Sequence, residues 1–253
     1  INFLIIISEY YNCFFILFIY VTLVKFFYKV ISIQSFIMHN TIKNLIYIEE
    51  LIKSKANHDE LTKIIAVSKT FPIENVLPLI EHGHLHYGEN KVQEALEKWT
   101  DIKNENHNIQ LHLIGRLQTN KVKFALKIFD YIHSLDSEKL ANKIADEQQK
   151  HKKKPKIFIQ VNMGNEDQKS GIDKRSLNDF YKFCKNLNLD IIGTMCIPPN
   201  DGNTEKYFSE MSDINKELNF KELSMGMSGD YLEAIRYNTT YVRIGSKIFG
   251  NRA

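Results

Sequence analysis

The first candidate for chemistry is a lysine at the carboxyl end of an apolar run. The stretch IIAVSKTFP begins at Ile64, and Lys69 follows residues that read as a buried strand. A lysine in this place either extends into water from the strand end or is held there as a nucleophilic amine, whose pKa falls when it is desolvated. The run by itself favours the solvated lysine, so the choice depends on what surrounds Lys69.

Two glycine-containing turns near the carboxyl terminus have the composition of a phosphate site. In SMGMSGD, Ser228 and Gly229 precede a helix-like segment, where a hydroxyl and backbone N–H groups can bind an anion. In RIGS, Arg243 is followed by Gly245 and Ser246, which form a second turn of small residues. Taken alone, Ser228 reads more simply as a helix cap. The phosphate interpretation therefore depends on the two turns together.

A phosphate site and a nucleophilic lysine could bind the two ends of one small ligand. A phosphorylated aldehyde suits both, because the amine forms a Schiff base while the turns hold the phosphate. Pyridoxal 5′-phosphate is the obvious cofactor of this class. This interpretation requires a fold that brings Lys69 close to Ser228 and Gly245.

The order of the predicted elements supplies such a fold. Eight apolar segments read as strands: 63–70, 85–90, 111–115, 131–136, 156–164, 190–199, 222–227 and 240–250. A helical pattern follows each strand except the last, and one more helix, with its apolar face from Ile42 to Ile52, precedes the first. Alternating strands and helices form parallel sheets covered by helices. We therefore predict an α/β fold, a single (β/α)₈ barrel over residues 38–253, with an open doubly wound sheet as the alternative.

The predicted barrel gathers the candidate residues at one end. In such barrels the functional site lies at the carboxyl ends of the strands, and phosphate is often bound by the loops after strands seven and eight. Lys69 follows the first strand and Asn90 the second, while Ser228 and Gly245 lie in the last two loops. The predicted phosphate site and the amine of Lys69 then lie at the same end of the barrel.

A series of motifs resembles one known family. AVSKT, HYGENKVQEA, LHLIGRLQTNK, IHSLDS, QVNMGNEDQKSGI, GTMCIPP, LSMGMSGDYLEAI and VRIGSKIFGNR occur in this order from about Ile42 to the carboxyl terminus. Together they resemble the pyridoxal phosphate homeostasis protein family, also called the YggS or PROSC family. The resemblance implies the barrel of the alanine racemase N-terminal domain.

The resemblance also implies roles for individual residues. Lys69 matches the lysine that forms the Schiff base with pyridoxal 5′-phosphate, and Asn90 matches a residue beside the cofactor ring. The phosphate-binding set corresponds to Ser228, Gly229, Gly245 and Ser246. Arg243 matches the arginine that faces the pyridine nitrogen; because arginine does not readily accept a proton, that nitrogen would stay unprotonated and the cofactor would be a weaker electron sink. Ser246, often threonine in the family, and Cys196 depart from the common pattern without removing a needed group.

The family resemblance implies binding without turnover. Alanine racemases use a second domain and a tyrosine from a partner subunit, and this sequence ends at Ala253, shortly after the last predicted strand. We expect a non-catalytic protein that holds pyridoxal 5′-phosphate on Lys69 and maintains its supply, with effects on amino-acid and keto-acid balance. A racemase with Lys69 as its base, and a phosphate-binding barrel enzyme without this cofactor, are the alternatives. The expected partners are pyridoxal 5′-phosphate and the apoenzymes that depend on it, and we expect a monomer.

Composition limits the other classes of function. The net charge of +3 is too small to indicate nucleic acid, and the basic run over residues 150–156 reads as a solvated loop. The cysteines have neither metal nor disulfide spacing, which predicts a reducing, cytoplasmic location. His82, His84 and His86 alternate closely, but we expect no metal site there.

Residues 1–37 form a hydrophobic extension outside the family resemblance. The segment YYNCFFILFIYVTLV, which begins at Tyr10, carries no charge and is somewhat short for a spanning helix. It lacks the features of a secretory signal. We interpret the extension as the product of an over-extended gene model with Met38 as the true start, and a membrane anchor is the alternative.

Overall fold

The computed structural model describes residues 38–55, 62–164 and 170–251. Nearly all of them belong to one unit, Asn40–Ala253. The predicted extension over residues 1–37 lies outside the described residues. Within the described ranges, no helix is both long enough and apolar enough to cross a membrane.

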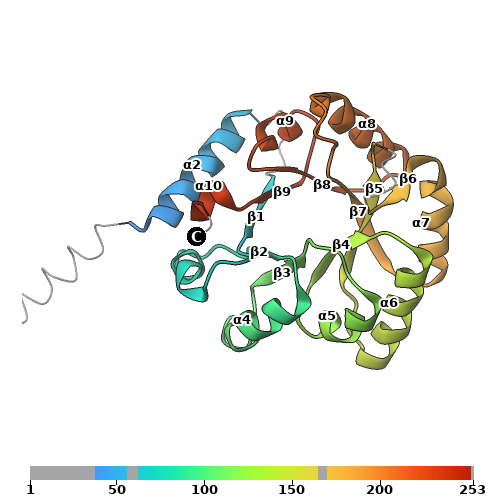
Figure 1. Cartoon of the computed structure of the whole chain (residues 1–253), viewed down its shortest axis with the longest axis horizontal. Coiled ribbons are helices and arrows are strands. Elements are labelled where there is room, and N and C mark those ends of the chain that lie inside the picture. The colour runs from blue at the N-terminus through green and yellow to red at the C-terminus, as the bar shows by residue number, and fades with distance from the viewer. Residues whose placement is uncertain (1–37, 56–61, 165–169, 252–253) are drawn as a thin grey trace, which may run out of the picture. The chain divides into compact units, whose positions relative to one another are not determined.

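The described residues form nine parallel strands, eight of which close into a barrel (Figure 1). The strands are β1 (Lys63–Val67), β2 (His86–Glu89), β3 (Gln110–Leu113), β4 (Tyr131–Leu135), β5 (Lys156–Asn162), β6 (Ile172–Asp173), β7 (Asp190–Cys196), β8 (Glu222–Met227) and β9 (Tyr241–Ile244). Around the ring the order is β4-β3-β2-β1-β9-β8-β7-β5, and the pairing of β4 with β5 completes it. The short β6 pairs with β5 outside the ring. The closed ring confirms the predicted (β/α)₈ barrel and excludes the open sheet.

Helices surround this barrel (Figure 1). They are α2 (Asn40–Lys55), α3 (Leu77–Glu81), α4 (Val92–Glu105), α5 (Val122–Ile128), α6 (Glu138–His151), α7 (Leu177–Asn186), α8 (Thr204–Glu217), α9 (Tyr231–Ile235) and α10 (Ser246–Phe249), with 3₁₀ turns η1 (Ile73–Asn75), η2 (Thr119–Lys121) and η3 (Lys174–Ser176). The helix predicted in front of the first strand is α2, which buries Leu45, Ile48 and Ile52.

The predicted strands 63–70 and 190–199 end earlier, at Val67 and Cys196, and two other predicted elements differ more from the structure. The last predicted strand, 240–250, is wrong beyond Ile244, because the chain turns at Gly245 into α10. The apolar residues of α10 pack inward: Ile248 is fully buried, and Phe249 stacks on Phe71 with ring centroids 5.1 Å apart. The predicted helix after the first strand is divided into η1 and α3.

Residues along each strand alternate between two cores. In β1, Ile64 and Ala66 belong to the large core that also contains helix residues, whereas Ile65 and Val67 belong to a separate cluster. Because neighbours on a strand point to opposite faces, this second cluster fills the interior of the barrel. The cluster contains Ile65, Val67, Tyr131, Phe158, Met195 and Tyr241. Buried polar residues share the interior with it, and they lead to the candidate site: His112, His133, Ser224 and Arg243.

Candidate functional site

Lys69 lies in a tight turn directly after β1. The N–H of Phe71 donates to the carbonyl oxygen of Ser68 at 3.1 Å, so Lys69 and Thr70 are the two central residues of the turn. Thr70 has a φ of 68°, a left-handed conformation that is costly for a branched side chain. Its N–H donates to Glu94 Oε1 in α4 at 2.7 Å, which stabilises this conformation. The turn presents Lys69, half-buried, at the carboxyl end of β1.

A buried carboxylate at the end of β2 supports this turn. Glu89 is fully buried, and its Oε1 accepts hydrogen bonds from Ser68 Oγ at 2.8 Å, Lys98 Nζ at 2.9 Å and Trp99 Nε1 at 3.0 Å. Lys98 also donates to the carbonyl oxygen of Ser68 at 2.9 Å. The residue before Lys69 is therefore fixed through both its side chain and its backbone. Glu89 falls within the predicted strand 85–90, but the sequence does not indicate its contacts with Ser68.

Asn90 follows β2 and packs closely against the next loop. A Cβ at Gly115, after β3, would lie 2.3 Å from the carbonyl oxygen of Asn90, so a residue with a side chain does not fit there. Asn90 also lines a cavity of about 390 Å³ with the cationic residues Lys91, Arg116 and Lys121. The loops after β2 and β3 thus form one rim of the barrel mouth.

The turns after β8 and β9 contact each other on the opposite side of β1. The Gly245 N–H donates to Ser228 Oγ at 3.3 Å. A Cβ at Gly245 would lie 3.2 Å from the carbonyl oxygen of Val67, so the turn passes close to the end of β1. Ser228 does not cap the following helix: Asp230 Oδ1 accepts the N–H of Met227 at 2.5 Å, and α9 begins at Tyr231. The side chain of Ser228 instead joins the two predicted phosphate turns.

Arg243 lies inside the barrel on β9 and is only 4% exposed. Its Nη1 donates to Ser224 Oγ at 2.7 Å, and its Nη2 donates to the carbonyl oxygen of Cys196 at 2.9 Å. Among the ion pairs of the described residues, none involves Arg243. Burial lowers the pKa of the guanidinium, and the nearby Cys196 and Asp230 oppose this shift. Arg243 is thus a buried cation held by neutral oxygen atoms.

The predicted site residues lie on four neighbouring strands. Around the ring, β2, β1, β9 and β8 are consecutive (Figure 1). Asn90 follows β2, Lys69 follows β1, and the two glycine turns follow β9 and β8. The predicted set is Lys69, Asn90, Ser228, Gly229, Arg243, Gly245 and Ser246. These residues form one region at the carboxyl ends of the strands, which is where a ligand with an aldehyde and a phosphate can meet them.

Comparisons with known proteins identify the family. The family model "Alanine racemase, N-terminal domain" matches residues 48–253. A protein of Pasteurella multocida (strain Pm70) named "Pyridoxal phosphate homeostasis protein" is 37% identical over 217 residues, which are 81% of this chain and 93% of that protein. The chain belongs to the pyridoxal phosphate homeostasis protein family.

Solved structures agree with this assignment. PipY of Synechococcus elongatus PCC7942 is 30% identical and superposes with a TM-score of 0.76 without PLP and 0.74 with PLP bound. These matches cover 84% and 83% of this chain, respectively, and 100% of PipY. An alanine racemase of Clostridium difficile 630, 16% identical with a TM-score of 0.65, covers 84% of this chain and 56% of the racemase. The last comparison shows a shared fold.

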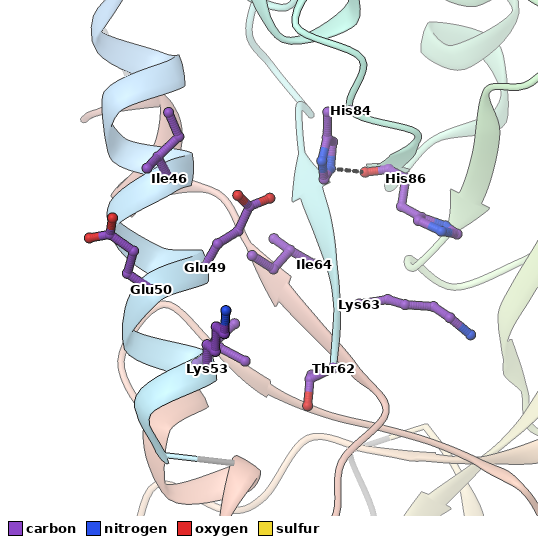
Figure 2. Close-up of a pocket in the computed structure, with 10 residues that line it drawn as sticks. Ile46, Glu49, Glu50, Lys53, Thr62, Lys63, Ile64, His84 and His86 are labelled. Carbon is purple, nitrogen blue, oxygen red and sulfur yellow. Dashed lines mark hydrogen bonds between the residues drawn. The ribbon is translucent and has the colours of Figure 1, made fainter. Parts of the chain in front are cut away.

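A second cavity of this homeostasis-family barrel lies at the other end of β1. It has a volume of about 370 Å³, and α2 and the beginnings of β1 and β2 line it (Figure 2). Glu49 points from α2 toward Ile64, while the ring of His86 points away from α2 (Figure 2). Burial raises the pKa of Glu49. Because the cavity is at the amino end of β1, it is separate from the Lys69 turn.

The histidines near this cavity form hydrogen bonds with protein groups. His84 Nε2 lies 3.0 Å from the carbonyl oxygen of His86, and His86 Nδ1 lies 3.0 Å from His112 Nε2. In the part of the chain that the structure describes, no group of three or more His, Cys, Asp or Glu side chains is placed to hold a metal ion. The sequence also drew attention to Cys196, which is buried and has a pKa raised to about 12 by desolvation.

Proposed function

We propose that this protein binds pyridoxal 5′-phosphate as a Schiff base with Lys69 and maintains its supply without catalytic turnover. The observation that carries the proposal is the meeting of two features at one barrel mouth. One is the Lys69 turn, held by Glu89 and Glu94; the other is the Ser228–Gly245 contact beside the end of β1. PipY, which is 30% identical to this chain, is known with PLP bound, and this supports the choice of ligand.

Each residue of the site has a distinct task in this proposal. Lys69 supplies the amine, and Asn90 lies beside the cofactor ring. Ser228, Gly229, Gly245 and Ser246 hold the phosphate. Ser228 Oγ accepts the Gly245 N–H, and its own proton is then available to donate to a phosphate oxygen. Ser246, which is exposed, presents a second hydroxyl.

Arg243 supports a protein that binds pyridoxal 5′-phosphate without using it for catalysis. Pyridoxal 5′-phosphate supplies an electron sink when its ring nitrogen is protonated. An arginine donates hydrogen bonds and does not accept a proton, so Arg243 would keep that nitrogen neutral. A weak electron sink suits a carrier better than a racemase. Racemases share the fold, and a measurement of racemisation distinguishes the two functions.

The name of the family supports a proposal about the wider role. We propose that the protein is a cytoplasmic monomer that supplies pyridoxal 5′-phosphate to dependent apoenzymes and so affects amino-acid and keto-acid balance. We further propose that residues 38–253 form the functional domain. Mass spectrometry of the endogenous protein would reveal whether the chain begins at Met38 or includes residues 1–37.

Absorption spectroscopy tests the binding proposal. The protein with added pyridoxal 5′-phosphate should develop a band near about 420 nm, as expected for a lysine Schiff base. Lys69→Ala should lose this band, and Lys91→Ala, at an exposed lysine on the same rim, should keep it. A full band in Lys69→Ala would refute the assignment of Lys69.

Isotope exchange separates the carrier from the racemase. The loaded protein is incubated with L-amino acids in deuterated water, and both deuterium at Cα and the D-enantiomer are measured. The carrier proposal predicts no multiple-turnover racemisation. Rapid exchange accompanied by many turnovers would establish the enzyme instead.

A further inference from the structure

A continuous series of hydrogen bonds crosses the barrel interior from Arg243 to the opposite end. Arg243 Nη1 donates to Ser224 Oγ at 2.7 Å, and Ser224 Oγ lies 3.0 Å from His133 Nδ1. His133 Nε2 lies 2.9 Å from His112 Nδ1, and His112 Nε2 lies 3.0 Å from His86 Nδ1. We call Ser224, His133, His112 and His86 the histidine chain. Its members come from four different strands, β8, β4, β3 and β2.

The rings of the histidine chain are clamped by aromatic neighbours. His112 stacks on Tyr131 with ring centroids 4.1 Å apart, and His133 stacks on Phe158 at 4.2 Å. His112, His133 and Ser224 are completely buried. Each central imidazole has both nitrogens engaged within the chain. The packing and the hydrogen bonds therefore fix the rings of His112 and His133 in one orientation.

The imidazoles are neutral at physiological pH. Burial is the largest cause that lowers the pKa of each ring, and for His133 the charge of Arg243 adds to it. A neutral imidazole has one N–H and one acceptor nitrogen. In a chain of such rings, each bond holds one proton, so all the protons must point the same way.

Arg243 decides this direction. The guanidinium can only donate, so Ser224 Oγ accepts from it. The hydroxyl proton of Ser224 then has His133 Nδ1 as its acceptor. His133 consequently carries its proton on Nε2 and donates to His112, which in turn donates from Nε2 to His86. In the reverse direction, Ser224 would accept from Arg243 and His133 at once, and among the described residues its proton would have no acceptor.

An aligned neutral chain stabilises a cation without cancelling its charge. Beyond the guanidinium, the proton of each bond points away from Arg243, so the negative end of each donor dipole faces the cation, and aligned hydrogen bonds strengthen one another. A carboxylate in the same place would neutralise the guanidinium. With neutral partners, the full positive charge of Arg243 acts on whatever group it faces.

We propose that the histidine chain is a positioning device that holds Arg243 as a fully charged donor at the cofactor ring. This rests on the proposed function, in which Arg243 faces the pyridine nitrogen. Ser224, His133, His112 and His86 act through Arg243 and are positioning residues. They keep the cofactor nitrogen unprotonated by preserving the charge and the direction of the guanidinium.

Nitrogen NMR tests the chain in the protein without added cofactor. With ¹⁵N-labelled histidine, assigned through single His→Gln variants, His112 and His133 should both be neutral, with the proton on Nε2. Protons on Nδ1, or rapid averaging of the two tautomers, would overturn the proposal. Because this readout needs no cofactor, it is independent of whether pyridoxal 5′-phosphate binds.

Spectra of the loaded protein test the effect on Arg243. His133→Phe removes the acceptor of Ser224 but keeps an aromatic ring against Phe158, while His133→Gln keeps both a donor and an acceptor. We expect His133→Phe to weaken pyridoxal 5′-phosphate binding about tenfold or more and to add a ring-nitrogen titration to the pH profile of the bound absorption band. His133→Gln should restore much of the wild-type profile. Circular dichroism checks that both variants fold.

The outcomes distinguish the two proposals. Fixed Nε2 tautomers together with no Schiff-base band in the wild type would refute the proposed function and leave the hydrogen-bond chain in place. A normal band whose pH profile is the same in wild type and folded His133→Phe would refute the positioning role of the chain.

Discussion

Glu94 of α4 accepts the backbone N–H of Thr70 at 2.7 Å, and Thr70 is the left-handed residue of the turn that carries Lys69. The carboxylate therefore stabilises a backbone conformation that a threonine would otherwise avoid. In this way a residue of α4 stabilises the turn in which Lys69 lies.

Removal of this acceptor should loosen the turn. Glu94→Ala should lower the free energy of unfolding by about 1 kcal/mol and weaken pyridoxal 5′-phosphate binding several-fold. Thr70→Gly should stabilise the protein by a fraction of this amount, because glycine adopts a positive φ without strain. Urea unfolding measures the stability of both variants. A titration of the Schiff-base band measures the binding of pyridoxal 5′-phosphate to Glu94→Ala. Equal stability of wild type and Glu94→Ala would show that the hydrogen bond does not hold the turn.

The buried carboxylate of Glu89 should be more critical than that of Glu94. Glu89→Ala leaves the amine of Lys98, whose side chain is 9% exposed, without its buried partner, and this should cost about 3–5 kcal/mol. Removal of both charges in Glu89→Gln/Lys98→Met should recover a large part of the loss, because a neutral pair has no uncompensated charge. Urea unfolding of Glu89→Gln, Lys98→Met and the double variant forms a double-mutant cycle. Additive losses in that cycle would contradict the coupling.

The contact between Ser228 and Gly245 should matter for the phosphate and not for the aldehyde. Ser228→Ala removes the acceptor of the Gly245 N–H and one hydroxyl from the proposed phosphate site. We expect binding of pyridoxal 5′-phosphate to weaken about tenfold or more, whereas binding of pyridoxal, which lacks the phosphate, should hardly change. Parallel titrations of the two aldehydes measure the difference. An equal loss for both would place Ser228 outside the phosphate site.

The barrel could be predicted from the sequence because its signals are local. Each strand is a short apolar run, and the alternation of strands with helices dictates a parallel sheet. The prediction failed at residues 246–249, where apolar residues continue after a strand but belong to α10. Here the close approach of Gly245 to Val67 turns the chain, and this tertiary contact leaves no periodic signal.

The positions of the candidate residues at the barrel mouth followed from strand order, but their supports did not. His112 and His133 read in the sequence as ordinary residues of apolar strands. Their partners come from other strands, and only the closed barrel brings Ser224 near His133. Likewise, the bond from Trp99 to Glu89 depends on how α4 packs. Spacing in a single sequence does not encode such contacts.

The buried histidines should make the protein sensitive to acid. Burial lowers the pKa of His84 and of His86 to about 4 and holds the pKa of His112 and His133 well below the ordinary value. In the unfolded chain a histidine binds a proton below about pH 6.5. Between about pH 6.5 and 4 the unfolded state thus binds more protons than the native state, so the free energy of unfolding falls as the pH falls. Above this window the effect is absent.

Urea unfolding between pH 5 and 8 measures this dependence. Each buried histidine contributes at most about 1.4 kcal/mol per pH unit, so His133→Gln should reduce the slope below pH 6.5, and His107→Gln at an exposed position controls for substitution as such. Carboxylates act in a different window: hydrogen bonds from Lys143 and Lys150 lower the pKa of Glu147 to about 2, so its stabilisation is lost only below about pH 4.5. A stability that is constant from pH 8 to 5 would show that the imidazoles are not held neutral in the native barrel.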